Sequence, residues 1–303
     1  MEHISFVVDE NLEGLRLDKA ITESAGPLIS RSFLQKIIKE EAVTVNGQVK
    51  KSSYKLVYGD EVDFTIPDAK EYQITAENIP LDILYEDDDV IVVNKPKGMV
   101  VHPANGHYEG TLVNALLYHC KDSLSGINGI LRPGIVHRID MDTTGSVIAC
   151  KNDKAHVCIA EQLKEHSIKR LYRAICHGVI KEDEGVIDEP IGRSPKDRKK
   201  MAVNPDGKNA VTHYKVLKRF SDYTYIECRL ETGRTHQIRV HMAHIGHPLL
   251  GDEVYGPAKV TYKTRGQCLH AYLLGFIHPV SGEYIETIAP IPEYMSELLD
   301  KLP

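Results

Sequence analysis

The amino-terminal part of the chain alternates between helical and strand-like spacing of apolar residues. Helical spacing is found at 15–21 and 30–39, and strand-like spacing at 42–49 and 59–64. Ser30 is a plausible N-cap for the second helix. Asn46-Gly47 is a strong signal for the turn of a two-residue hairpin. Together these patterns predict a compact small unit over residues 1–66.

Beyond this unit, residues 67–80 are polar and bounded by prolines, which predicts a linker. The rest of the chain is dominated by strand patterns, predicted at 81–84, 90–94, 147–151, 172–178, 212–217 and 224–230. Helices are predicted at 111–118, 154–165 and 236–244. Because strands and helices do not alternate regularly, a doubly wound parallel sheet is disfavoured. An α+β domain with a large mixed or antiparallel sheet and flanking helices is predicted over residues 81–303.

Length and composition fit a globular protein of about two domains, with 303 residues, 42% of them hydrophobic and 26% charged. The sequence has neither eighteen consecutive apolar residues nor a secretory leader pattern, so we expect no membrane span. Its six cysteines are scattered without Cys-x-x-Cys spacing, as is typical of buried thiols in a reducing compartment. A cytoplasmic protein is therefore expected.

The net charge of −6 gives no support to a nucleic-acid partner, because phosphate neutralisation favours basic proteins. Positive charge is nonetheless concentrated locally. The segment from Arg31 to Lys55 contains six basic and two acidic residues, and the segment from Arg193 to Lys200 contains five basic residues and one acidic residue. Local basic faces of this kind keep RNA among the possible partners.

One carboxylate, Asp140, stands out in the segment 132–145. An apolar pair leads into His-Arg-Ile-Asp, and Thr-Thr-Gly then leads into a second apolar run. An active-site acid is often held in this way, between two short strands and beside a cation and hydroxyls. A structural aspartate in a strand–turn–strand has the same pattern, so these residues alone leave both interpretations open. Asp142 and the Thr-Thr-Gly that follows it are expected to shape the turn.

Two further segments carry candidate chemistry at a strand boundary. Lys95-Pro96 is followed by Gly98, which predicts a rigid turn at the end of a strand. Tyr172 begins a predicted strand beside cations, where it could stack on a base. An ordinary turn and a half-buried strand tyrosine explain these two patterns equally well.

Two cationic segments follow later in the chain. Proline and glycine in residues 190–203 argue against regular structure, so its cations are predicted to lie on a loop that could follow a phosphate backbone. A solvated charge run is the common alternative. In residues 231–252, Thr235 is predicted to cap a helix, which would aim Arg234 at the end of the sheet.

The histidines of the last segment do not fit a metal site. They are His236, His241, His244 and His247. On a helix these positions do not share one face, and zinc requires three or four converging ligands. The chain has no phosphate-binding glycine loop, dinucleotide fingerprint or serine nucleophile elbow. A metal-dependent hydrolase is therefore a remote alternative, and no metal or nucleotide cofactor is expected.

Taken together, these segments resemble the RluA/RluD-type pseudouridine synthases. The matching blocks are His137-Arg138-Ile139-Asp140-x-Asp142-Thr143-Thr144-Gly145, Asn94-Lys95-Pro96-x-Gly98, Lys169-x-x-Tyr172-x-Ala174, Gly233-Arg234-Thr235-His236-Gln237-Ile238-Arg239-Val240-His241 and Gly246-His247-Pro248-Leu249-Leu250-Gly251-Asp252. Residues 15–64 are similar to the small S-four RNA-binding domain. The resemblance covers essentially the whole chain, with small departures at Ile139 and Cys268. It implies that residues 81–303 form the catalytic domain, with a central cleft.

The resemblance implies a role for each of several residues. Asp140 would be the catalytic carboxylate, with Arg234 as the ion-pair partner that favours its ionised form. Tyr172 would stack on the extruded uracil and Ile238 would pack near it. The remaining substrate-binding candidates are Arg138, His137, Lys95, Arg193 and Arg198. Isomerisation neither gains atoms nor loses electrons, so the implied reaction needs no cofactor.

The implied substrate is RNA, with large-subunit ribosomal RNA favoured over transfer RNA. A non-catalytic RNA-binding or ribosome-assembly factor is the second interpretation, and it would not need Asp140 with Arg234. A monomer is the default expectation for the oligomeric state.

Overall fold

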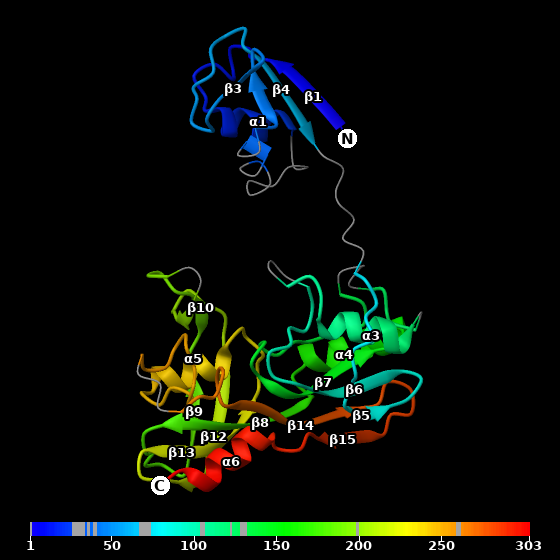
Figure 1. The fold of residues 1–303 in the computed structure, drawn as a ribbon, viewed down its shortest axis with the longest axis vertical. Coiled ribbons are helices and arrows are strands. Elements are labelled where there is room, and N and C mark those ends of the chain that lie inside the picture. The colour runs from blue at the N-terminus through cyan, green and yellow to red at the C-terminus, as the bar shows by residue number, and fades with distance from the viewer. Residues whose placement is uncertain are drawn as a thin grey trace. The chain divides into compact units, whose positions relative to one another are not determined.

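The computed structural model describes residues 2–25, 34, 37–38, 41–66, 74–103, 107–121, 123–127, 132–197, 200–258 and 262–303. The chain divides into two compact units, Met1–Tyr72 and Gln73–Pro303, which are described separately (Figure 1). Most of the predicted helix over 30–39, including its N-cap Ser30, lies outside the described residues. Leu34, Ile37 and Ile38 are described and are helical and buried.

The first unit is a four-stranded sheet with a helix. Its elements are β1 (Glu2–Val7), α1 (Leu17–Ala25), β2 (Val43–Val45), β3 (Gln48–Val49) and β4 (Glu61–Ile66), with strand order β1-β4-β2-β3. Asn46 and Gly47 both have positive φ, 51° and 74°, as a two-residue hairpin turn requires. Leu17, Ile21 and Phe64 are buried in its core. The predicted hairpin is confirmed.

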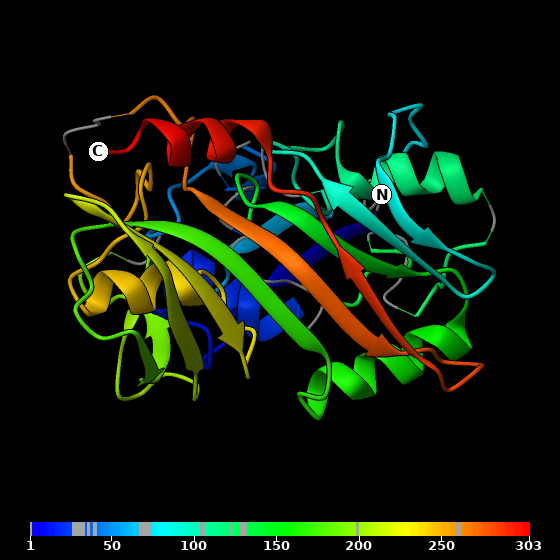
Figure 2. The same ribbon diagram turned by 90° about the horizontal axis from the view of Figure 1, so that it is seen from below.

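The second unit is built on a nine-stranded sheet. Its strands are β5 (Ile83–Glu86), β6 (Val90–Lys95), β7 (Thr144–Cys150), β8 (Lys169–His177), β9 (Glu184–Asp188), β12 (Val211–Arg219), β13 (Tyr223–Leu230), β14 (Leu269–Ile277) and β15 (Tyr284–Ile288). The order is β5-β6-β7-β14-β8-β13-β12-β9, with β15 paired to β14. All pairings are antiparallel except that of β7 with β14. The predicted α+β class is therefore confirmed, and β14 and β8 lie side by side at its centre (Figure 2).

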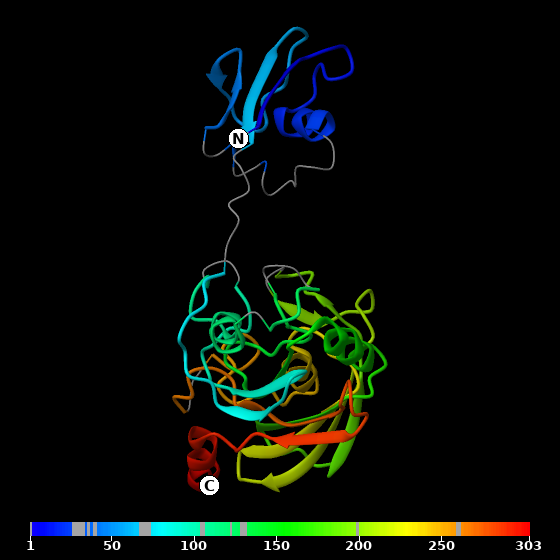
Figure 3. The same cartoon turned by 90° about the vertical axis from the view of Figure 1, so that its right-hand side faces the viewer.

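Four helices accompany the sheet in the described part of this unit: α3 (Leu112–Cys120), α4 (Asp153–Lys164), α5 (Gln237–His244) and α6 (Glu293–Lys301). Alternate residues of β6 point to opposite faces and join different clusters. Ile91 and Val93 pack in the cluster that contains α3 and α5, whereas Val90 and Val92 pack in the cluster that contains α4. Helix α6 packs in a further cluster with β8 and β13, and Figure 3 shows strands of the sheet lying between α5 and α6. Within the described residues, no helix combines the length and apolar character needed to cross a membrane.

The predicted loop over residues 190–203 is wrong at its two ends, because β10 (Ile191–Arg193) and β11 (Met201–Val203) form an antiparallel hairpin, whereas residues 194–197 and 200 between them are neither helix nor strand. A two-stranded ribbon consists only of edges, so the neighbouring proline removes no central ladder bond. Gly192 admits close packing, since a Cβ there would lie 3.2 Å from the Cα of Gly207. Glycine therefore serves the hairpin rather than preventing it.

Part of the expected linker packs on the second unit. Asn114 on α3 donates its side-chain amide to the carbonyl of Thr75 at 2.8 Å and accepts the amide of Glu77 at its own carbonyl at 3.0 Å. Ile74 packs against the main core. The second unit therefore includes residues that precede the first predicted strand.

The parallel contact between β7 and β14 requires a glycine at position 145. Gly145 has φ +107°, and a Cβ there would lie 2.3 Å from the carbonyl oxygen of Ala271. We expect Gly145→Ala to lower the free energy of unfolding by about 3 kcal/mol or more. Gly282→Ala is the matched control, because Gly282 has φ +73° but open space around it, and should lose only about 1 kcal/mol. Thermal unfolding followed by circular dichroism would measure both, and equal losses would contradict the role of this contact.

Candidate active site

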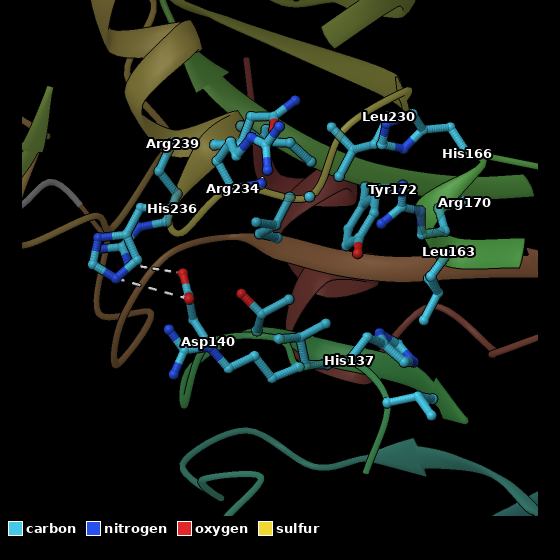
Figure 4. Close-up of a pocket in the computed structure, with 18 of the residues that line it drawn as sticks. His137, Asp140, Leu163, His166, Arg170, Tyr172, Leu230, Arg234, His236 and Arg239 are labelled. Carbon is cyan, nitrogen blue, oxygen red and sulfur yellow. Dashed lines mark hydrogen bonds and ion pairs between the residues drawn. The ribbon is translucent and has the colours of Figure 1, made fainter. Parts of the chain in front are cut away.

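A cavity of about 520 Å³ opens on the second unit. Its wall comes from the turn before β7, the end of α4, β8, the end of β13 and α5 with the residues before it (Figure 4). Among the described residues that line it, five are arginines or lysines and only Asp140 is acidic. A concave site of this volume with one carboxylate among cations suits an anionic substrate.

Asp140 forms an ion pair at the cavity wall with the first turns of α5. Its Oδ2 accepts a hydrogen bond from Nη1 of Arg239 at 2.9 Å, and Nε2 of His236 lies 3.8 Å from its Oδ1 (Figure 4). The Asp140 side chain is 25% exposed, whereas that of Arg239 is 7% exposed. The carboxylate is thus held from inside the protein while it remains accessible from the cavity.

Arg239 is itself fixed by a second carboxylate. Its Nε and Nη2 donate to the two oxygens of Asp252 at 2.6 and 2.9 Å, in the bidentate geometry that arginine favours. The Asp252 side chain is fully buried. Burial raises the pKa of Asp252, but the hydrogen bond and charge of Arg239 outweigh it, so this pKa lies below its usual range. Burial likewise opposes ionisation of Arg239, yet the two carboxylates raise its pKa further.

Tyr172 and Ile238 lie on facing elements of the cavity. Tyr172 is the fourth residue of β8, and its neighbours on the adjacent strands are Cys228 and Ala271. Its side chain points into the cavity, and burial raises its pKa. Ile238 comes from α5 and is 3% exposed. An aromatic ring and an aliphatic side chain thus supply the apolar surfaces of a site otherwise lined by charges.

Comparison with known proteins places this geometry in a family. Residues 89–244, just over half of the chain, match the family model described as RNA pseudouridylate synthase, and residues 15–62 match that of the S4 domain. The chain belongs to the RNA pseudouridine synthase family. Members of this family are isomerases.

Full-length relatives agree with this assignment. The chain is 53% identical over 302 residues to the uncharacterized RNA pseudouridine synthase YlyB of Bacillus subtilis, covering 100% of this chain and 99% of the relative. It is 47% identical to the ribosomal large subunit pseudouridine synthase D of Zymomonas mobilis, over 97% and 95% of the two chains. Among solved structures, human RNA pseudouridylate synthase domain containing 1 aligns with a TM-score of 0.58 at 24% identity, over 75% of this chain and 96% of the other. That likeness supports the fold alone.

In this pseudouridine synthase, the predicted ion pair between Arg234 and Asp140 is wrong. Nε of Arg234 donates to the carbonyl oxygen of Asn209 at 2.8 Å, although the residue does line the cavity. Arg239 makes the ion pair instead. Helix α5 begins only at Gln237, so Arg234 precedes it, whereas Arg239 lies in its first turn. The sequence contained a signal for Arg239, because an arginine between Ile238 and Val240 is buried and requires an acidic partner.

The predicted cap of α5 is also wrong. The N-cap residue is His236, with φ 57°, and the Thr235 hydroxyl accepts a hydrogen bond from Arg138 at 3.3 Å. The N-cap makes no side-chain cap hydrogen bond; instead the Gln237 side-chain oxygen accepts the amide of Arg234 at 3.0 Å, and the Gln237 backbone amide donates to the Arg234 carbonyl at 3.1 Å. These contacts hold the residues before the helix in a turn, and His236 in that turn lies beside Asp140.

His236 is oriented by Tyr255. The Tyr255 hydroxyl accepts the backbone amide of Met201 at 3.0 Å and lies 2.9 Å from Nδ1 of His236. In the tautomer with the imidazole proton on Nε2, Nδ1 accepts a hydrogen bond from this hydroxyl and Nε2 faces Asp140. The Tyr255 ring also lies 5.2 Å from the guanidinium carbon of Arg239. One tyrosine thus supports both groups that face Asp140.

Lys95 supports the turn that carries Asp140, and its predicted contact with RNA is wrong. Its side chain is fully buried, and Nζ donates to the carbonyls of Pro96, Met99 and Met141 at 2.8, 2.7 and 2.9 Å. Burial lowers the pKa of Lys95 to about 7, against the opposing charges of Asp142 and Asp140. All three ammonium protons are used within the protein, so none is left for RNA.

The residues after Asp140 hold the turn from the other side. Gln267 donates to the Thr143 hydroxyl at 3.1 Å, and the Thr144 hydroxyl lies 2.8 Å from Nδ1 of His270. The structural role expected for these residues is confirmed by these contacts. Burial raises the pKa of Asp142, whose side chain lies against Gly266.

The other predicted substrate-binding residues are placed differently. Arg138 is exposed and lines the cavity. His137 also lines it, but its Nε2 accepts the amide of Ile148 at 3.0 Å and so positions the turn against β7. Arg193 is exposed at the end of β10 and is not one of the described residues that line the cavity. Arg198 lies outside the described residues.

The histidines considered for metal binding do not converge in the described part of the chain, where the one group with metal-ligand spacing is Asp87, Asp89 and His278. His241 is buried, with its two nitrogens bonded to Thr212 and Glu189. Nδ1 of His278 accepts the backbone amides of residues 280 and 281, so Nε2 carries the proton and donates to Asp87 at 2.8 Å. The group is therefore explained as a hydrogen-bonded clamp between loops.

The burial of His137 makes stability depend on pH. Burial, together with the charge of Arg170, lowers the pKa of His137 from 6.5 to about 4. Between these values the unfolded state binds more protons than the folded state, so stability falls as the pH falls. His137→Gln retains an acceptor for the amide but does not titrate. From pH 7 to pH 5 we expect the wild type to lose on the order of 1–2 kcal/mol more than this variant in chemical denaturation. Parallel losses would contradict the assignment.

Proposed function

We propose that this chain converts specific uridines of large-subunit ribosomal RNA to pseudouridine, with Asp140 as the catalytic carboxylate. The observation that carries the proposal is the ion pair of Asp140 with Arg239 on the wall of a cationic cavity. The family assignment supplies the reaction, and the names of several relatives supply the substrate class. Among them are synthases D of Zymomonas mobilis and Pasteurella multocida, named for the ribosomal large subunit.

The reaction breaks the bond between ribose and N1 of uracil, turns the base, and joins ribose to C5. In our proposal the target uridine leaves its helix and enters the cavity, because the reacting atoms are inaccessible in a stacked duplex. Tyr172 stacks on the uracil while Ile238 packs near it. The two side chains would hold the free base in place between bond cleavage and bond formation.

Asp140 serves this reaction as an anion held in a fixed direction. Arg239 occupies its Oδ2, and Nε2 of His236 faces its Oδ1. In the bound state the carboxylate acts on the ribose or the base that the cavity presents to it. Pre-oriented charges lower a barrier because they need no reorganisation during the reaction.

RNA recognition would be shared between the two units. We assign the S4 domain a role in binding RNA, and Arg138 and Arg234 a role in contacting RNA at the cavity. Arg193 is proposed as a further backbone contact on the β10–β11 hairpin. A monomer acting in the cytoplasm fits this proposal. The role we propose for Arg234 is therefore substrate binding and not the ion pair with Asp140.

Asp140→Asn tests the catalytic assignment. The amide is nearly isosteric with the carboxylate but cannot carry its charge, so we expect modification to be abolished while RNA binding is retained. Carbodiimide mapping of ribosomal RNA from a deletion strain complemented with wild type or variant would measure this. Asp183→Asn is the control, since it neutralises an aspartate in an exposed ion pair with Arg219. Full modification by the Asp140 variant would sink the proposal.

Substitutions of Arg239 and Arg234 should affect different kinetic parameters. Arg239→Lys keeps the charge buried beside Asp252 but loses the fork, so we expect kcat to fall by roughly 100-fold with little change in KM. Arg234→Met should instead raise KM several-fold with kcat nearly unchanged. Steady-state kinetics on a transcript that spans the mapped uridine would distinguish them. A KM effect from Arg239 and a kcat effect from Arg234 would reverse the two assignments.

A further inference from the structure

We infer that Arg170, with Lys164 and His166, forms a phosphate-binding subsite at the end of the cavity away from Asp140. The inference rests on the proposed function and deepens it, because the ligand would be a phosphate of the RNA backbone next to the extruded uridine. Figure 4 shows Arg170 and His166 on one side of Tyr172 and Asp140 with Arg239 on the other. All of them line the same cavity.

Arg170 is a buried cation without an acidic partner among the described residues. It is 7% exposed, its Nε has no hydrogen-bond partner, and Nη2 donates only to the neutral carbonyl of Glu231 at 3.3 Å. No carboxylate in the described part of the chain lies within 4 Å of its guanidinium. A buried charge is costly unless an anion compensates it. Here the cavity is the open direction from which such an anion can come.

The guanidinium is held in place before any ligand arrives. It lies against the backbone of Gly233, where an added Cβ would be 2.9 Å from Nη1. Arg170 and Tyr172 are two residues apart on β8 and therefore project from the same face of the strand. A base stacked on Tyr172 would thus carry its sugar and phosphates past the arginine.

Lys164 and His166 line the cavity beside Arg170. Lys164 is the last residue of α4, and His166 follows with a positive φ of 59°. Lys164 pairs with Glu161 at 2.9 Å, but both side chains are exposed, and such pairs contribute little. His137 is kept neutral here, since burial and the Arg170 charge lower its pKa to about 4. The chemistry fits a phosphate better than a uracil carbonyl, because phosphate offers both a full negative charge and two oxygens for a guanidinium fork.

The test is a double-substitution cycle, in which RNA affinity is measured with Arg170 replaced, with one RNA phosphate neutralised, and with both changes together. The RNA is a synthetic stem-loop that spans the mapped uridine, with one neutral methylphosphonate placed either 5′ or 3′ of it. Binding is measured for Asp140→Asn enzyme with and without Arg170→Met. We expect one methylphosphonate to weaken binding by about tenfold when Arg170 is present and by less than twofold when it is absent. The slope of log K against log salt should also fall by about one for Arg170→Met.

Arg173→Met is the matched control. Arg173 lies on the same strand, pairs with Glu227 at 2.9 Å and is not among the described residues that line the cavity, so its loss should leave the cycle unchanged. Arg170→Lys, which keeps the charge, is the second variant should Arg170→Met fail to fold, and it should show a reduced methylphosphonate effect. Independent, multiplicative effects at both linkages would overturn the subsite. The cycle measures binding only, so active Asp140→Asn enzyme would refute the proposed catalysis without deciding the subsite.

Discussion

The active site depends on one buried guanidinium shared by two carboxylates. Arg239 gives two of its nitrogens to the fully buried Asp252 and one to Asp140. If Arg239 paired with Asp140 alone, the pair would have a net charge of zero, and the reactivity of the carboxylate would be lower. Because Asp252 also pairs with Arg239, the three groups in their ionised forms carry a net charge of −1, and the Asp140 side chain remains 25% exposed. The same arrangement makes the site intolerant of change, since removal of any partner leaves an unpaired charge in the interior.

The surrounding structure holds Asp140 and Arg239, the two groups of this ion pair, in position. Lys95 ties the carbonyl of Met141 to the end of β6, and so holds the turn that bears Asp140. Tyr255 contacts His236 through its hydroxyl and Arg239 through its ring. That hydroxyl also accepts the amide of Met201 on β11, which connects the cationic β10–β11 hairpin to His236 beside Asp140. RNA bound on the hairpin would therefore act on groups one contact away from Asp140.

The sequence predicted those parts of the fold and site that depend on local patterns. The hairpin at Asn46-Gly47, strand β7 after Asp140 and the helix beginning near position 236 follow from turn chemistry and periodicity. The short strand expected before Asp140 is wrong, because Ile135 forms only an isolated bridge, to Ala149. Strand β14 was not predicted, because its residues are apolar on both faces and lack the alternation of a half-buried strand. The choice of Arg234 over Arg239 failed because the pairing is decided by where α5 starts, and the unusual φ of His236 sets that start. Long-range partners such as Asp252 depend on folding that no local pattern specifies.

The distribution of charge reconciles an acidic protein with an RNA substrate. The net charge of −6 belongs to the whole surface, whereas the described cavity lining contains five cations and one acid. The Asp252 carboxylate is fully buried, and neither Asp252 nor Asp142 is among the described residues that line the cavity. Under the proposed function, a backbone phosphate at the cavity would meet Arg170 at the end away from Asp140 (Figure 4). An acidic exterior disfavours unspecific contact with RNA, so the proposed function requires affinity to come from local cationic surfaces such as the cavity lining.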